Sequence, residues 1–203
     1  ASVLDSTIKT NQQILLERKQ LLALQTQYKS GKSLSASDTS WLNKLADEYK
    51  ISSPDLSSNT TWQELDKRVD IVPASLVLAQ AIQESGWGTS QVARYAHNYF
   101  GQECFSHGCG VDTGRNWHGS YYEMAKFVSV DDAISSYIHN LNSNNAYKLM
   151  RNIRYSERLQ KEKINSMALV NGLKAYSELG NRYIYAIKNV VNHLNLQQFD
   201  NVV

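Results

Sequence analysis

The sequence predicts a mainly α-helical protein with one small β element. Most of its 203 residues fall into segments whose apolar residues recur at helical spacing, and residues 121–130 are the best strand candidate. The long irregular stretch, residues 88–119, is rich in glycine. The hydrophobic fraction of 42% and the charged fraction of 20% are ordinary for a globular protein. A chain of this length can bury a sizeable core.

Charge and composition exclude several classes of function. The net charge of +2 argues against nucleic-acid binding, which needs a concentrated basic face. No apolar run reaches the roughly 20 residues that cross a bilayer. The five histidines lack metal-binding spacing, and no phosphate-binding glycine loop or Gly-x-Ser-x-Gly elbow occurs. We therefore expect no nucleic acid, no transmembrane segment, no metal and no cofactor. The chain begins at Ala1 with no signal peptide, so we expect a processed or trimmed chain.

Residues 1–60 are expected to form a helical arm packed on the core. Residues 4–29 carry an apolar stripe that ends at Gly31. A second helix is predicted over residues 35–50, where capping residues precede an apolar face. Residues 61–203 are then the main domain.

A short helix and a buried helix are expected to open the main domain. Thr61 and Glu64 have the spacing of a capping box, which predicts a helix start. Residues 72–88 are apolar almost all round, which is typical of a helix in the middle of a domain, and Pro73 suits its first turn. The apolar residues are Val72, Leu76, Val77, Leu78, Ala79, Ala81 and Ile82.

Two polar side chains interrupt this buried helix. Gln80 and Glu84 lie four residues apart and so share one face. Gly86 and Gly88 stop the helix just after Glu84. A carboxylate is almost never fully buried without a partner or a purpose. The segment therefore predicts a cleft with an acid at its floor.

Both cysteines, Cys104 and Cys109, fall in the glycine-rich stretch, within the segment CFSHGC. Gly108 makes a small disulfide loop feasible. A free or metal-bound pair is the alternative, but zinc sites usually need four ligands and only His107 is close by in sequence. We favour the disulfide, which implies an oxidising compartment.

The rest of the chain is expected to add a strand pair and several helices. Residues 110–117 are the expected hairpin partner of residues 121–130. A short helix is expected over residues 91–96. Asp131 is expected to cap a helix that runs to about Asn142. Later helices are predicted over residues 145–151, 156–160, 164–173 and 180–196.

Glu84 is the first candidate for chemistry. Apolar burial and the negative end of the helix dipole would both raise its pKa. A carboxyl that stays protonated near neutral pH can protonate a leaving oxygen, so Glu84 is a candidate general acid. A helix-end glutamate that faces solvent is the alternative. The neighbours Gly86 and Trp87 favour the functional interpretation.

A second carboxylate would decide the mechanism. Glu103, Asp112 and Glu123 are candidates, and each could be a solvated charge. Glu123 is the best placed, because it lies on the predicted strand, where a hairpin could form a cleft wall. Asn98 could hold a substrate hydroxyl or amide, or cap a loop. Tyr176 falls in a break between two helices, where it could point into a groove or into the core.

Two motifs, in order and at the right interval, resemble the bacterial glucosaminidases of glycoside hydrolase family 73. The first is a helix ending in Glu-Ser-Gly-Trp-Gly (residues 84–88), and the second is His-Asn-Tyr-Phe-Gly (residues 97–101). Residues 126–137 are similar to the family's strand and following helix, and residues 176–183 to its tyrosine motif. The resemblance covers about residues 65–196.

The resemblance implies a lysozyme-like fold with its small β-hairpin beside the active-site cleft. It also implies hydrolysis of the β-1,4 bond between N-acetylglucosamine and N-acetylmuramic acid in peptidoglycan, with residues 61–203 as the glucosaminidase catalytic domain. The loop of residues 104–109 looks most like the Bax-type branch, which implies the periplasm or exterior of a Gram-negative cell. We expect a monomer that acts on peptidoglycan glycan strands.

The resemblance also implies roles for single residues. Glu84 aligns with the family's general acid and Tyr176 with its functional tyrosine. Many members carry a second acidic residue in a Thr-Thr-Glu segment that this sequence lacks, and Glu123 is the expected substitute, ahead of Asp112. If neither faces Glu84, the substrate's own acetamido group could act as the nucleophile. The residues expected to bind sugar are Gln80, Trp87, Asn98, Phe100 and Tyr122.

Two other functions remain open from the sequence. A lytic transglycosylase or a muramidase could also act through Glu84, and the transglycosylase would leave an anhydro product. A peptidoglycan-binding module with little catalytic activity would account for the missing Thr-Thr-Glu segment.

Overall fold

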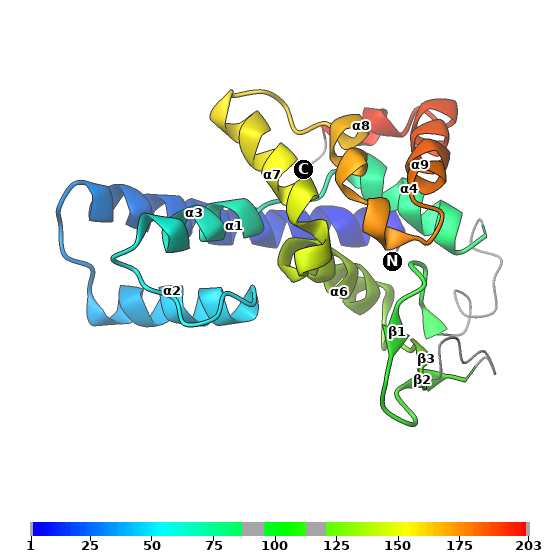
Figure 1. The fold of residues 1–203 in the computed structure, drawn as a ribbon, viewed down its shortest axis with the longest axis horizontal. Helices are drawn as coiled ribbons and strands as arrows, with labels where there is room; N and C mark the ends of the chain where they lie inside the picture. The colour runs from blue at the N-terminus through cyan, green and yellow to red at the C-terminus, as the bar shows by residue number, and fades with distance from the viewer. Residues whose placement is uncertain (1, 87–95, 113–120, 202–203) are drawn as a thin grey trace.

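The computed structural model describes residues 2–86, 96–112 and 121–201, and it shows packed helices with one small sheet at their edge (Figure 1). The predicted mainly α class with a small β element is confirmed. The helix predicted over residues 91–96 falls almost wholly outside the described residues. The helices are α1 (Val3–Lys29), α2 (Ala36–Glu48), α3 (Asn59–Arg68), α4 (Ala74–Glu84), α6 (Val130–Ser143), α7 (Lys148–Leu159), α8 (Ser166–Leu169) and α9 (Asn181–His193), with 3₁₀ turns η2 (Asn145–Tyr147), η3 (Val170–Gly172), η4 (Lys174–Tyr176) and η5 (Leu196–Phe199).

α4 packs against α1, α8, α9 and η5, and it lies beside α9 in Figure 1. At its start, the backbone N–H and the hydroxyl of Ser75 donate to the carboxylate of Asp200, at 2.8 and 2.7 Å. The helix ends at Glu84, and Gly86 takes a φ of +57° that favours glycine. Its buried residues, on almost every side as predicted, are Ala74, Ser75, Leu76, Val77, Ala79, Gln80 and Ala81.

α1 fixes the segment that leads into α4. The side chain of Asn11 exchanges two hydrogen bonds with the backbone of Val72, at 2.8 and 3.3 Å. Arg18 donates to the carbonyl of Val69 at 2.9 Å. Apolar residues of α1 and α4 belong to one hydrophobic cluster, so α1 packs on the core. A domain border at residue 60 stays a prediction.

The start of α3 differs from the prediction. Thr61 lies inside the helix, and its hydroxyl accepts the backbone N–H of Asp55 from the preceding loop. Ser58 caps the helix instead, because its hydroxyl accepts the N–H of Thr60. The capping box predicted at Thr61 is therefore wrong, although the short helix is present.

The start of α6 also differs. Ser129 is the N-cap, and its hydroxyl accepts the backbone N–H of Asp132. The predicted cap, Asp131, lies in the first turn and accepts hydrogen bonds from Ser6 and Lys9 instead. Its carboxylate is thus used to join α6 to α1.

The helices predicted over residues 145–151 and 156–160 are one continuous helix, α7, preceded by the turn η2. Two arginines in its middle are buried rather than solvated. Arg151 donates to the carbonyls of Leu141 and Asn144, and Arg154 donates to three other backbone carbonyls. Residues 152–155, which lie between the two predicted helices, therefore continue the helix, and Arg154 belongs to its buried face.

The sheet has three short antiparallel strands in the order β1-β3-β2. The pairing of β2 (Gly110–Val111) with β3 (Glu123–Ala125) is the predicted hairpin, whereas β1 (Glu103–Cys104) was not expected. β3 is shorter than the predicted strand, because after Lys126 the N–H of Phe127 donates to the carbonyl of Ala96 outside the sheet. We call this sheet, with residues 101–112 and 121–128, the sheet lobe.

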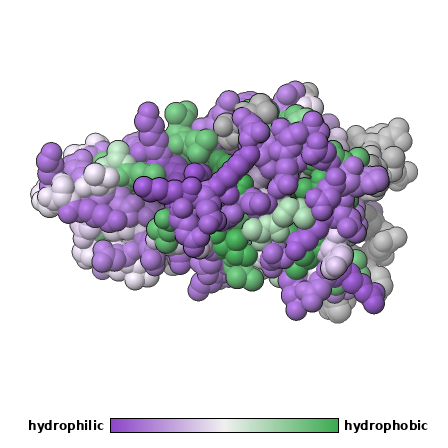
Figure 2. Space-filling model, turned by 90° about the horizontal axis from the view of Figure 1, so that it is seen from above, coloured by the Kyte–Doolittle hydropathy of each residue, from purple (hydrophilic) through white to green (hydrophobic). Residues whose placement is uncertain are grey.

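Polar side chains cover most of the face seen from above in Figure 2, with apolar residues between them. The exposed large apolar side chains are spread over several elements, as is normal for a protein surface. Within the described residues, no helix has both the length and the apolar character to cross a membrane. The exposed large apolar residues are Leu16, Leu22, Phe105, Val111, Val128, Leu149, Leu159, Leu179 and Tyr185.

Asp70 lies between the end of α3 and the start of α4, and its carboxylate joins α1 to α7. Its carboxylate is 1% exposed and accepts two hydrogen bonds from Arg158, at 2.9 and 2.6 Å. Arg18 adds a second ion pair at 3.5 Å. Burial alone would raise the pKa of Asp70, but the hydrogen bonds from Arg158 and the charges of Arg154 and Arg18 outweigh it and lower the pKa.

Asp70→Ala is expected to lower the free energy of unfolding by roughly 3–5 kcal/mol, because it leaves buried arginines without their counter-charge. Since the folded pKa of Asp70 is lowered, its contribution is present above the unfolded pKa of about 3.9 and is lost as the pH falls through the folded value. Urea denaturation at several pH values measures the loss of unfolding free energy and its dependence on pH. Asp47→Ala, at an exposed position, is the control, and equal losses in the two variants would contradict the role of Asp70.

Candidate active site

Glu84, at the end of α4, has four tyrosines around it. They come from four different elements: Tyr137 from α6, Tyr147 from η2, Tyr176 from η4 and Tyr183 from α9. The ring of Tyr176 contacts the other three, with centroid distances of 5.6 to 6.3 Å. Burial and then negative neighbours, Glu84 among them, raise the pKa of all four hydroxyls, which therefore stay neutral.

Burial sets the protonation of Glu84. It raises the pKa of the carboxyl above its ordinary value, and a hydrogen bond with Tyr183 lowers it in part. This is the direction of shift that the sequence predicts for a buried carboxyl at the end of α4. A carboxyl held this way keeps its proton at higher pH than an exposed glutamate does, which is what a general acid requires.

The turn of residues 97–101 faces the Glu84 carboxyl. Gly101 has a φ of +66°, and a Cβ placed on it would lie 3.5 Å from Oε2 of Glu84. The ring of Phe100 stacks on Tyr137, with centroids 3.9 Å apart, and its carbonyl accepts the hydroxyl of Tyr176 at 2.9 Å. The turn, the tyrosines and the acid thus form one packed group.

Asn98 and Phe100, two of the expected sugar-binding residues, have buried side chains that serve this turn. Asn98 is 2% exposed; its amide donates to the carbonyls of Gln102 and Ala125, and its oxygen accepts the N–H of Gln102. Phe100 is 1% exposed. Asn98 therefore holds the turn against the sheet lobe, whereas the ring of Phe100 packs the turn against Tyr137 of α6.

Gln80 is fully buried beside Glu84. Its Nε2 donates to the hydroxyl of Tyr183 at 2.8 Å, and its Oε1 accepts the hydroxyl of Tyr137. With 0% exposure, Gln80 has no surface to offer a substrate, so its role here is within the tyrosine group. Trp87, another expected sugar-binding residue, lies outside the described residues.

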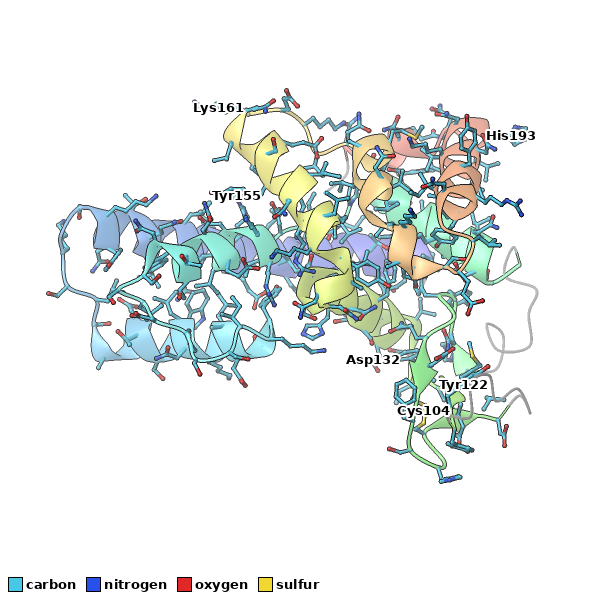
Figure 3. All side chains as sticks on the ribbon, viewed as in Figure 1. Cys104, Tyr122, Asp132, Tyr155, Lys161 and His193 are labelled. Atoms are coloured by element: carbon cyan, nitrogen blue, oxygen red, sulfur yellow. A yellow bond between two sulfur atoms is a disulfide. The ribbon has the colours of Figure 1, made fainter. Side chains whose placement is uncertain are left out.

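The disulfide predicted between Cys104 and Cys109 is confirmed. It closes a ring of six residues in the sheet lobe, where Figure 3 shows Cys104 near Tyr122 and apart from the main group of helices. Tyr122, half-buried, precedes β3. The ring is therefore part of the lobe that follows the turn of residues 97–101.

Glu123, the expected second carboxylate, holds this ring. Its Oε2 accepts the N–H of Gly108 at 2.9 Å and the hydroxyl of Tyr121, and its Oε1 accepts the N–H of Gly110 at 2.8 Å. The hydrogen bond from Tyr121 and then those from the two glycines lower its pKa. His107 stacks on Tyr121, with centroids 3.9 Å apart. A carboxylate with a lowered pKa is a weaker base.

Two other acidic candidates lie in the same lobe. Glu103 is exposed on β1, and Asp112 is exposed just after β2. The negative charge of Asp112 acts on Tyr121, together with that of Glu123. Within the residues that the structure describes, no group of three potential ligands could hold a metal ion.

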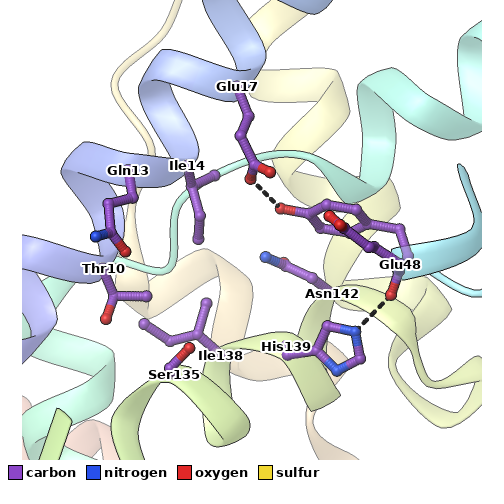
Figure 4. A pocket seen from close by; sticks show the side chains of 10 residues that line it. Thr10, Gln13, Ile14, Glu17, Glu48, Ser135, Ile138, His139 and Asn142 are labelled. Carbon is purple, nitrogen blue, oxygen red and sulfur yellow. Dashed lines mark hydrogen bonds between the residues drawn. The ribbon is translucent and has the colours of Figure 1, made fainter. Parts of the chain in front are cut away.

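A separate pocket of about 520 Å³ lies between α1, the end of α2 and α6 (Figure 4). None of the residues expected to act in catalysis or sugar binding lines it. Two hydrogen bonds join residues of its lining: Tyr49 donates to Glu17 at 3.0 Å, and His139 bonds the carbonyl of Glu48 at 2.6 Å. We therefore place the candidate active site at Glu84 and not in this pocket.

The family described as mannosyl-glycoprotein endo-beta-N-acetylglucosaminidase matches residues 59–196 of the chain. The chain belongs to this glucosaminidase family. It is also 33% identical over 180 residues to Protein bax of Escherichia coli (strain K12), an alignment that covers 87% of this chain and 62% of that protein. The chain thus spans less than two thirds of that relative's length. The family predicted from the two sequence motifs is confirmed.

One solved structure that is similar to this chain is the catalytic domain of the autolysin Auto from Listeria monocytogenes. The TM-score is 0.44 at 16% identity, with 87% of this chain and 96% of that chain covered.

Three tyrosines of the site were not singled out from the sequence: Tyr137, Tyr147 and Tyr183. Tyr137 carried a usable signal, because it lies at helical spacing from Ile134 and Leu141 on the apolar face of α6. That pattern predicts burial but not the partner. The contacts with Glu84 depend on tertiary packing.

Gly101→Ala is expected to cost about 1–2 kcal/mol of stability, because its φ is positive, and to lower glycosidase activity, because the added methyl group would touch the Glu84 carboxyl. Gly31→Ala is the matched control, since Gly31 has a φ of +83° and open space around it. Thermal unfolding and digestion of cell-wall glycan measure the two effects. Equal activity in the two variants would contradict the placement of Gly101 against the acid.

Proposed function

We propose that this chain is a peptidoglycan hydrolase that cleaves the β-1,4 bond between N-acetylglucosamine and N-acetylmuramic acid, with Glu84 as general acid. The observation that carries the proposal is the partly buried Glu84 carboxyl, with its raised pKa, among four neutral tyrosines. In this environment the carboxyl holds a proton that it can give to the glycosidic oxygen as the bond breaks.

The substrate's own acetamido group is our proposed nucleophile. The predicted alternative, Glu123, accepts three hydrogen bonds inside the sheet lobe, and its lowered pKa makes it a poor base for activating water. Attack by the acetamido oxygen on the anomeric carbon needs no second carboxylate from the protein. Glu123 then acts by holding the ring closed by Cys104 and Cys109, and Tyr122 and Tyr176 remain candidates for sugar contact.

The enzyme is proposed to work as a monomer in the periplasm or outside the cell, on glycan strands of peptidoglycan. The disulfide between Cys104 and Cys109 supports an oxidising compartment. The family's activity on N-acetylglucosamine-containing glycans supports the substrate class.

Product analysis tests the bond and the reaction. Purified peptidoglycan is digested, reduced with borohydride and examined by mass spectrometry. We expect new reducing ends on N-acetylglucosamine, with one water added for each bond cleaved. Reducing ends on N-acetylmuramic acid would indicate a muramidase, and anhydro ends a lytic transglycosylase. Either result would overturn the proposed specificity.

Glu84→Gln is expected to lower the digestion rate by a factor of roughly 10²–10⁴, because the amide cannot donate the proton. Turbidity loss of a peptidoglycan suspension measures the rate. Glu162→Gln, at an exposed position on the loop after α7, is expected to match the wild type. Full activity in Glu84→Gln would show that another group is the acid. No activity in the wild type, with intact binding, would favour the binding-module alternative.

Azide rescue separates the two roles considered for Glu123. A base that activates water can be replaced by a small anion, so azide would restore activity to Glu123→Ala if that base were Glu123. We expect no rescue, because the carboxylate holds the ring through Gly108 and Gly110. Formation of an α-glycosyl azide by the variant would contradict the acetamido mechanism and restore Glu123 as the second catalytic carboxylate, since azide that opens an oxazolinium intermediate gives the β-azide.

A further inference from the structure

We propose that Gln80 and Tyr137 are positioning residues that fix the direction in which Tyr183 donates its proton to Glu84. The three side chains form a one-way chain of hydrogen bonds, Tyr137 to Gln80 to Tyr183, that ends on the acid. The inference deepens the proposed function and rests on Glu84 being the general acid.

The donor and acceptor atoms set the direction of this hydrogen-bond chain. The hydroxyl of Tyr137 donates to Oε1 of Gln80, and Nε2 of Gln80 donates to the hydroxyl oxygen of Tyr183 at 2.8 Å. An amide nitrogen is a donor only, so at that contact Tyr183 must accept. Its single proton is then free for the hydrogen bond that it shares with Glu84.

Burial keeps the hydrogen bonds pointing from Tyr137 through Gln80 to Tyr183. Tyr137 and Gln80 are 0% exposed and Tyr183 is 2% exposed, so an unpaired polar atom here would be costly. If the Gln80 amide turned over, its oxygen would face Tyr183 and draw that proton away from Glu84. The donation from Tyr137 to Oε1 opposes this change, which makes Tyr137 the residue that sets the orientation of Gln80.

The hydrogen-bond chain stabilises the negative charge that forms on Glu84 during the reaction. Glu84 is neutral before it gives up its proton and negative afterwards, and a donor aimed at it binds the negative form more strongly. Among the described residues, the other titratable groups that face Glu84 are the hydroxyls of Tyr137, Tyr147 and Tyr176, all neutral with raised pKa values. Burial raises the pKa of Glu84, and the hydrogen bond with Tyr183 lowers it in part.

Tyr183→Phe tests the end of the chain by removing one oxygen atom. In a pH profile of kcat/KM, we expect the limb on the alkaline side, where Glu84 loses its proton, to move up by roughly one unit. The maximal rate should fall about tenfold or more. Tyr185→Phe is the matched control, because Tyr185 lies on the same helix and is 72% exposed. Its profile should superimpose on that of the wild type.

Tyr137→Phe and Gln80→Met test the positioning step. Each should move the alkaline limb in the same direction as Tyr183→Phe but by less, because Tyr183 stays present and loses only its fixed direction. Carbon-13 NMR titration of the Glu84 carboxyl follows the same shift without relying on activity. If Gln80→Met fails to fold, Tyr137→Phe and Tyr183→Phe still decide, since both are single-atom deletions.

The outcomes separate this proposal from the proposed function. An unmoved or lowered limb in Tyr183→Phe, with Glu84→Gln inactive, would overturn the hydrogen-bond chain and leave Glu84 as the acid. A shift in Tyr183→Phe with no shift in Tyr137→Phe would overturn the positioning roles of Gln80 and Tyr137. An active Glu84→Gln variant would overturn the proposed function itself.

Discussion

The burial of two polar side chains on one helix is the constraint on which this structure depends. α4 is enclosed by helices on almost every side, yet it carries Gln80 and Glu84 on one face. Each needs hydrogen-bond partners, because an unpaired polar group in the core destabilises the fold by more than most single contacts stabilise it. Tyr137 of α6 and Tyr183 of α9 supply the hydrogen bonds, and the rings of Tyr147 in η2 and Tyr176 in η4 pack beside them. Four segments that are distant in sequence are thereby tied to the end of one helix, where the carboxyl that we propose as the acid is found.

The sheet lobe is joined to this centre by a few specific bonds. Asn98 donates to the carbonyl of Ala125 at the end of β3, Phe127 donates to the carbonyl of Ala96, and Tyr176 donates to the carbonyl of Phe100. Inside the lobe, the disulfide and Glu123 hold the ring of residues 104–109. The helices thus provide the acid and its environment, while the lobe is a small, covalently closed unit that we propose contacts the glycan.

The sequence predicts the parts of this site that depend on local pattern. Apolar periodicity reveals α4 and the odd carboxyl at its end, and the short spacing of Cys104 and Cys109 reveals their disulfide. The partners of polar side chains are not visible in this way. Gln80 looks like a substrate ligand beside Glu84, but its partner Tyr183 is 103 residues away. Two expected helix caps, Thr61 and Asp131, are wrong for a related reason, since contacts outside their helices occupy both side chains.

The pKa of Glu84 in the intact protein is the most direct test of this view of the site. Carbon-13 NMR of the side-chain carboxyl, assigned by comparison with Glu84→Gln, follows its titration without any substrate. If burial governs the site, Glu84 titrates above the ordinary glutamate value of about 4.3. A pKa at or below that value would mean that the carboxyl is ionised at neutral pH and cannot be the proton donor.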